Sequence, residues 1–269
     1  MTLIKKALRK GFNTPVLNNW VLNNVYIALK LDPWLNSVVN PYVLSYAPDP
    51  NKSLQEIAGY SDTPEINEVI AKIRHYVQRA KKEYLKPGAA VLDLGCGPGM
   101  YLQDFTDLPS GEGVGYQIHG VDISQHMIDF AQREYPNGTF YTGNLIEVDF
   151  GTKSFDFISS HGMLEFITRS DVPKMFRKVH QLLKPGGIFL MSYPHATSWA
   201  DTMYSDLKYF SYSPDLVNKL NEPLFNILTH EHVLHERYVG KYDQHPIVPQ
   251  NSQYTRTCRN SSIFIAQKQ

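Results

Sequence analysis

Short apolar runs alternate with amphipathic stretches along most of the chain. The runs are typical of strands, because they are short and apolar or alternating, and the first of them is followed by glycines. They lie at 89–94, 117–122, 139–141, 155–159, 188–192 and 261–266. A further strand is expected around 233–239. The amphipathic stretches predict helices over 17–29, 63–84 and 171–183, and another that begins at Ser124.

Capping and breaking residues mark the ends of these helices. Thr63-Pro64-Glu65 supplies an N-cap, a proline in the first turn and a carboxylate near the positive helix end. Lys86-Pro87-Gly88 ends the same helix, and Lys184-Pro185-Gly186-Gly187 ends the later one. Strands that alternate with helices predict an α/β fold with a parallel sheet, whose ligands bind at the carboxyl ends of the strands.

The composition is that of a globular protein. The chain has 269 residues, 42% of them apolar, and its 26 basic side chains balance 26 acidic ones. This neutral charge disfavours a nucleic-acid-binding surface. Two cysteines are too few for a disulfide framework or a structural zinc site, so we expect free thiols and a cytoplasmic protein. No apolar run reaches the roughly 18 residues of a membrane span.

A glycine loop, Asp93-Leu94-Gly95-Cys96-Gly97-Pro98-Gly99, follows the first strand of the predicted sheet. Glycines let the backbone approach a ligand closely. The spacing is not the dinucleotide fingerprint, because Met100 stands where that motif has its third glycine, and a dehydrogenase is therefore disfavoured. Asp122 ends the second strand, where a carboxylate can accept hydrogen bonds from both hydroxyls of a ribose.

Four motifs in order resemble the class I S-adenosylmethionine-dependent methyltransferases. They are VLDLGCGPG at 91–99, GVDIS at 120–124, FDFI at 155–158 and LKPGG at 183–187. The resemblance covers roughly residues 86–192. It implies a Rossmann-like, seven-stranded, mostly parallel sheet with helices on both faces. It also implies S-adenosylmethionine as cofactor and S-adenosylhomocysteine as product. We therefore expect a methyltransferase domain at 86–269 with an insertion at about 193–230, preceded by a helical cap at 1–85.

The resemblance assigns cofactor contacts to the glycine loop. The backbone of Gly95, Cys96 and Gly97 would pass beneath the methionine and ribose parts of the cofactor, and Gly99 closes the same loop. Asp93 would hold the amino group, directly or through water.

Further contacts are implied at the next strands. Asp122 would bind the ribose hydroxyls, and Ile123 would lie against the adenine ring. Asn144 and Leu145 belong to the segment Gly143-Asn144-Leu145, where many members carry Gly-Asp-Ala with the carboxylate directed at the adenine amino group. The Asn144 carbonyl can still accept that hydrogen bond. His161 stands where the family places residues near the methionine moiety and the substrate.

Methyl transfer from a sulfonium is an in-line displacement, so the protein mainly aligns the acceptor and excludes water. A hydroxyl or carboxylate acceptor can also need a base or a hydrogen-bond partner. The catalytic candidates are His161 after the fourth strand, and Tyr193 and His195 after the fifth. The alternatives are that His161 is a packing or cofactor-shell residue and that His195 is an ordinary loop histidine.

The segment 193–212 is dense in aromatic residues, and this fold commonly inserts substrate-covering elements there. We expect 1–85 and 193–230 to form the pocket of a small-molecule acceptor, apolar or ring-bearing and methylated on oxygen. The alternative is that these rings only pack the insertion onto the sheet. Methylation of RNA or protein, and a non-catalytic S-adenosylmethionine-binding module, are the other functions considered; base-methylase motifs are absent from the sequence.

A histidine-rich segment could suggest a metal site. It contains His230, Glu231, His232 and His235. No partner cluster accompanies it, so no metal is expected. The sequence leaves a homodimer open.

Overall fold

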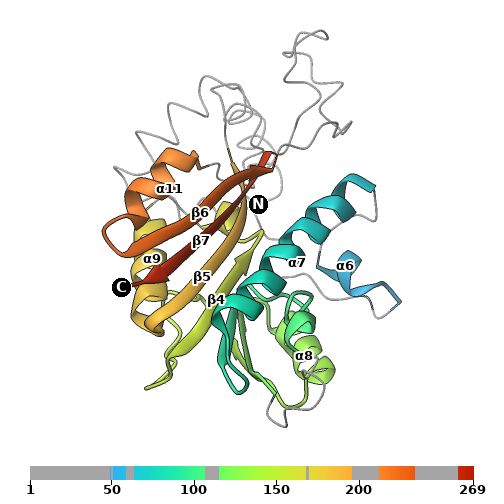
Figure 1. Cartoon of the computed structure of the whole chain (residues 1–269). Helices are drawn as coiled ribbons and strands as arrows, with labels where there is room; N and C mark the ends of the chain where they lie inside the picture. Colours follow the sequence, from blue (N-terminus) through green and yellow to red (C-terminus); the bar gives the residue numbers. More distant parts are fainter. Residues whose placement is uncertain are drawn as a thin grey trace, which may run out of the picture.

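The computed structural model describes residues 49, 51–58, 64–106, 115–167, 170–195, 212–233 and 260–269. In these ranges seven strands form one sheet in the order β3-β2-β1-β4-β5-β7-β6 (Figure 1). The strands are β1 (Ala90–Leu94), β2 (Gln117–Asp122), β3 (Thr139–Thr142), β4 (Phe155–His161), β5 (Leu183–His195), β6 (Phe225–Val233) and β7 (Asn260–Lys268). Strands β1 to β5 pair in parallel, whereas β7 runs antiparallel to β5 and β6. The expected α/β class and mostly parallel sheet are confirmed.

Helices cover both faces of the sheet. They are α6 (Leu54–Ile57), α7 (Pro64–Tyr84), α8 (Gln125–Glu134), α9 (Val172–Leu182) and α11 (Pro214–Asn221), with the short 3₁₀ turns η2 (Leu102–Phe105) and η3 (Leu164–Phe166). Helices α9 and α11 lie on one side of the sheet in Figure 1, and α6, α7 and α8 lie on the other. We name these two sides the α9 face and the α7 face.

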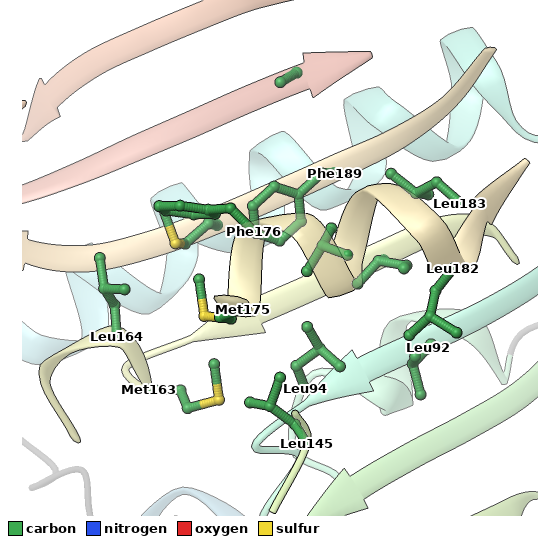
Figure 2. Close-up of a cluster of buried hydrophobic side chains, with 14 of the residues drawn as sticks. Leu92, Leu94, Leu145, Met163, Leu164, Met175, Phe176, Leu182, Leu183 and Phe189 are labelled. Carbon is green, nitrogen blue, oxygen red and sulfur yellow. The ribbon is translucent and has the colours of Figure 1, made fainter. Parts of the chain in front are cut away.

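Each face has its own hydrophobic core. On the α9 face, the stripe of α9 packs against β1, β4 and β5, and Figure 2 shows Phe176 beside Phe189 and Leu182 beside Leu92. On the α7 face, Ile73 and Val77 belong to a second cluster with strand residues such as Val91, Phe157 and Leu190. Alternate residues of β1, β4 and β5 therefore point to opposite faces, and both faces are apolar.

Capping explains where two helices begin. The Ser124 hydroxyl accepts a hydrogen bond from Met127 N, and the Ser213 hydroxyl accepts one from Leu216 N. The helices expected at 63–84, after Ser124 and at 171–183 are confirmed by α7, α8 and α9. In the described ranges no helix has the length and apolar content needed to cross a membrane.

Two strands differ from the prediction. Helix α9 ends at Leu182 and strand β5 begins at Leu183, so residues 184–187 already belong to β5 and not to a loop before it. In this part of β5 the pairing with β4 shifts register between Phe155 and Phe157. Strand β6 (Phe225–Val233) was not expected. Of the strand expected around 233–239, only Val233 is described, and residues 234–239 lie outside the described ranges. The segment 193–230 thus contains α11 and most of β6. The helix expected at 17–29 also lies outside the described ranges.

One hydrogen bond joins the helix α7 to the edge strand β6. The buried Tyr76 donates its hydroxyl to the carboxylate of the exposed Glu231. Tyr76→Phe removes this bond but keeps the ring, and the Glu231 carboxylate stays hydrated. We expect the free energy of unfolding to fall by about 1 kcal/mol in urea denaturation.

Tyr84→Phe on the same helix is the matched control, because Tyr84 is 40% exposed. It should change the free energy of unfolding by less than about 0.5 kcal/mol. Equal effects of the two substitutions would show that the Tyr76–Glu231 bond contributes nothing.

Candidate active site

The glycine loop leaves β1 with three residues in the left-handed region. Gly95, Gly97 and Gly99 have φ values of +67°, +51° and +88°. A Cβ on Gly95 would lie 2.8 Å from Met163 Cγ, and one on Gly99 would lie 2.4 Å from Tyr135 Cε2. A Cβ on Gly97 would meet no atom within 4 Å. Two tightly packed glycines therefore flank one whose backbone faces open space.

The loop is fixed by hydrogen bonds from the end of β2. Gly95 N and Cys96 N both donate to Val121 O, at 2.8 and 3.0 Å. Gly97 N donates to Asp122 Oδ2 and Ser124 N donates to Asp122 Oδ1, each at 2.9 Å. Burial raises the pKa of Asp122, and the two N–H donors act against that rise. Each carboxylate oxygen can still accept a further hydrogen bond from a ligand hydroxyl.

Asp93 is a second acidic group at the same end of the sheet. It is buried, and its Oδ1 accepts a hydrogen bond from Ser159 Oγ at 2.8 Å. Burial raises the pKa of Asp93 to about 7, the Ser159 bond opposes the rise, and the neighbouring Asp122 charge adds to it. A cationic group placed beside Asp93 would favour its ionised form.

His161 ends β4 on the α7 face, two residues beyond Ser159. Its Nδ1 lies 3.0 Å from Ser192 Oγ on the adjacent strand β5, and its ring centroid lies 4.1 Å from that of Tyr101. Its Nε2 has no hydrogen-bond partner among the described residues. Burial lowers the pKa of His161 to about 3, so the imidazole is neutral at physiological pH.

The residues expected near the adenine differ in whether their side chain or only their backbone can contact a ligand. Ile123 is apolar and yet 41% exposed, directly after Asp122. Asn144 Oδ1 accepts a hydrogen bond from Ile146 N at 3.1 Å and keeps one lone pair for a ligand. The side chain of Leu145 is buried in the core of the α9 face (Figure 2), and that of Cys96 is buried against Gly120, so only their backbones can face a ligand.

The catalytic candidates on β5 do not join His161. The side chain of Tyr193 is 1% exposed and belongs to the core of the α9 face, whereas His161 lies on the α7 face. The Tyr193 hydroxyl lies 2.9 Å from His230 Nε2, and His230 Nδ1 lies 2.6 Å from Asn218 Oδ1. His195 ends β5 with its backbone paired to Asn260, and its side chain is outside the described ranges.

The histidine-rich segment is divided by the sheet. His230 points into the α9 face, whereas Glu231 is on the α7 face with Tyr76. The side chain of His232 and the whole of His235 lie outside the described ranges. Where side chains are described, no group of three His, Cys, Asp or Glu residues could hold a metal ion.

Sequence reasoning did not identify Ser159, Ser192 or Tyr101. The two serines face Asp93 and His161 because β4 pairs in register with β1 and β5, matching Asp93 with Ser159 and His161 with Ser192. In the sequence, the serines are visible only as polar residues in otherwise apolar strands. Their partners can be identified only when the register of the neighbouring strands is known.

The fold and the site together define a class. A seven-stranded sheet with one antiparallel strand, a glycine loop after β1 and a carboxylate after β2 is the arrangement expected of class I methyltransferases. Residues 91–187 match the model of a family described as a methyltransferase domain. Residues 91–187 therefore belong to a class I S-adenosylmethionine-dependent methyltransferase domain.

Curated relatives over part of the chain include methyltransferases. An uncharacterized methyltransferase from Synechocystis is 31% identical over 117 residues, which are 42% of this chain and 51% of that protein. Phosphoethanolamine N-methyltransferase 3 from Arabidopsis thaliana is 34% identical over 40% of this chain and 21% of its own length. The chain thus spans about half or less of these relatives.

A solved structure shares the fold over most of the chain. It is the magnesium protoporphyrin IX methyltransferase from Synechocystis with bound S-adenosylmethionine, at a TM-score of 0.55 and 15% identity. The match covers 87% of this chain and 97% of that one.

The raised pKa of Asp93 implies that the free energy of unfolding depends on pH. Between pH 7 and pH 4, Asp93 is protonated in the folded state but ionised in the unfolded chain, where its pKa has the ordinary value. The free energy of unfolding therefore rises as the pH falls through this range. Asp93→Asn removes the buried charge. We expect the variant to be more stable than the wild type by about 1–2 kcal/mol at pH 8, and to differ little at pH 5.

Urea denaturation of both proteins at the two pH values measures this difference. A variant that is less stable than the wild type at pH 8 would contradict a raised pKa.

Proposed function

We propose that this chain transfers a methyl group from S-adenosylmethionine to a small-molecule acceptor. The observation that carries the proposal is the backbone at Gly97, which has a positive φ and faces open space beside the carboxylate of Asp122. A ligand can approach that backbone to a distance that a side chain would prevent.

The described residues fit the parts of this cofactor. The buried carboxylate of Asp93 suits its ammonium group, and the spare lone pairs of Asp122 suit the two ribose hydroxyls. The exposed Ile123 offers an apolar surface to the adenine ring. When bound, the cofactor supplies a methyl group already activated by its sulfonium. The protein's remaining task is to align the acceptor and exclude water.

The proposed acceptor is a small, apolar or ring-bearing molecule that is methylated on oxygen. The neutral chain and the small molecules in the names of two similar proteins, phosphoethanolamine and magnesium protoporphyrin IX, support a small acceptor. The aromatic segment 193–212 supports an apolar or ring-bearing one. We place the reaction in the cytoplasm, which suits the free thiol of Cys96. Methylation of RNA or protein is the alternative, for which no observation argues.

The described residues narrow the choice of a base. Tyr193 is a poor candidate for a base, because it is buried on the α9 face and burial raises its pKa. His161 is neutral and buried, and its Nδ1 already lies within hydrogen-bond distance of Ser192 Oγ. If the acceptor requires a base, His195 is our candidate, because its backbone lies at the carboxyl end of β5.

Gly97→Ala tests the cofactor site, and Gly151→Ala is its matched control. Both glycines have positive φ values, +51° and +62°, and neither would bring a Cβ within 4 Å of another atom. Each substitution should cost about 1 kcal/mol of stability through backbone strain. We expect only Gly97→Ala to weaken binding of S-adenosylhomocysteine, by tenfold or more, because its methyl group would occupy the ligand's place.

Calorimetric titration measures the two affinities, and urea denaturation confirms that both variants fold. An unchanged affinity in folded Gly97→Ala would contradict the proposed binding place. A comparable loss in Gly151→Ala would show that strain, and not contact, is responsible.

A further inference from the structure

One hydrogen bond determines what His161 can do in the site. A neutral imidazole carries one N–H donor and one acceptor nitrogen, and the group bonded to one nitrogen decides which is which. The partner of Nδ1 is Ser192 Oγ, 3.0 Å away, and both side chains are buried.

The serine hydroxyl must place its hydrogen on an acceptor, because a buried donor without one is costly. Within the described part of the chain, His161 Nδ1 is the one acceptor bonded to Ser192 Oγ. A Ser192 hydroxyl that donates to Nδ1 places the proton of the imidazole on Nε2. His161 is then a donor on its other edge.

That donor has no partner among the described residues, although His161 is only 7% exposed. Leaving a buried N–H unpaired costs about 1–3 kcal/mol. Tyr101, which follows the glycine loop, packs against the ring and restricts its orientation. A fixed, unpaired donor beside a glycine loop is typical of a group that awaits a ligand.

The position of His161 indicates which part of the ligand it meets. Ser159 lies two residues earlier on the same face of β4, about 6.6 Å away along the strand, and it binds Asp93. In the proposed function Asp93 takes the ammonium group of the cofactor, and the carboxylate is attached to the same carbon. An N–H facing a carboxylate forms a charge-assisted hydrogen bond.

We propose that Ser192 holds His161 as a neutral Nε2–H donor, and that this N–H binds the carboxylate at the amino-acid end of the cofactor. The inference rests on the proposed function. It makes Ser192 a positioning residue and removes His161 from the candidates for a base, because its acceptor nitrogen is already bonded to Ser192.

Nuclear magnetic resonance of the ¹⁵N-histidine-labelled full chain tests the role of Ser192 without any turnover. We expect His161 to show a protonated Nε2 and an unprotonated Nδ1 at pH 7. Ser192→Ala should release this preference and give a mixture of tautomers. Ser160→Ala is the matched control, because Ser160 is an equally buried neighbour that points to the opposite face, and it should leave the His161 signals unchanged. A proton on Nδ1, or an unaltered tautomer in Ser192→Ala, would overturn the role of Ser192.

The ligand half is tested by two substitutions and two ligands. The amide nitrogen of glutamine reaches about as far as Nε2, whereas that of asparagine reaches only as far as Nδ1. We expect His161→Asn to lose about tenfold in affinity for S-adenosylhomocysteine, and His161→Gln to lose less than about threefold. Both should bind 5′-methylthioadenosine, which lacks the amino-acid end, like the wild type.

The outcomes separate this inference from the function on which it rests. Equal losses for both ligands, or no loss in His161→Asn while the wild type binds S-adenosylhomocysteine, would overturn the carboxylate contact alone. A wild type that binds neither ligand would overturn the proposed function together with this contact. The tautomer of His161 would still decide the role of Ser192.

Discussion

The carboxylate of Asp122 ties the glycine loop to the start of α8. It accepts N–H groups from Gly97 on one side and from Ser124 on the other, so the loop after β1 and the turn after β2 hold each other in place. Met163 and Tyr135 fill the space beside Gly95 and Gly99, which leaves the backbone at Gly97 as the part that faces outward. The same carboxylate thus shapes the loop and remains able to bind a ligand.

The buried polar groups of the site all lie on one face of the sheet. Parallel register matches Asp93 with Ser159 and His161 with Ser192, so each ionisable side chain has a hydroxyl partner. The enclosure shifts both pKa values toward the neutral form, raising that of Asp93 and lowering that of His161. A ligand with an ammonium and a carboxylate group would meet a matching acid and donor.

Local signals predicted the glycine loop, the helices α7, α8 and α9 and six of the seven described strands, because turns, caps and apolar runs are encoded by neighbouring residues. They did not predict that Tyr193 and His161 point to opposite faces. Strands buried on both sides are apolar throughout, so the sequence does not reveal which residues share a face. That information comes from the pairing of β4 with β5, which also brings Ser192 to His161. Strand β6 was not predicted, because its polar residues resemble those of a loop.

The central claim is that the loop after β1 binds S-adenosylmethionine and not a dinucleotide. Calorimetric titration of the full chain with S-adenosylhomocysteine, beside NAD under the same conditions, tests it most directly. We expect saturable binding of S-adenosylhomocysteine at one site and none of NAD. Binding of NAD alone, or of neither ligand by a folded sample, would contradict it.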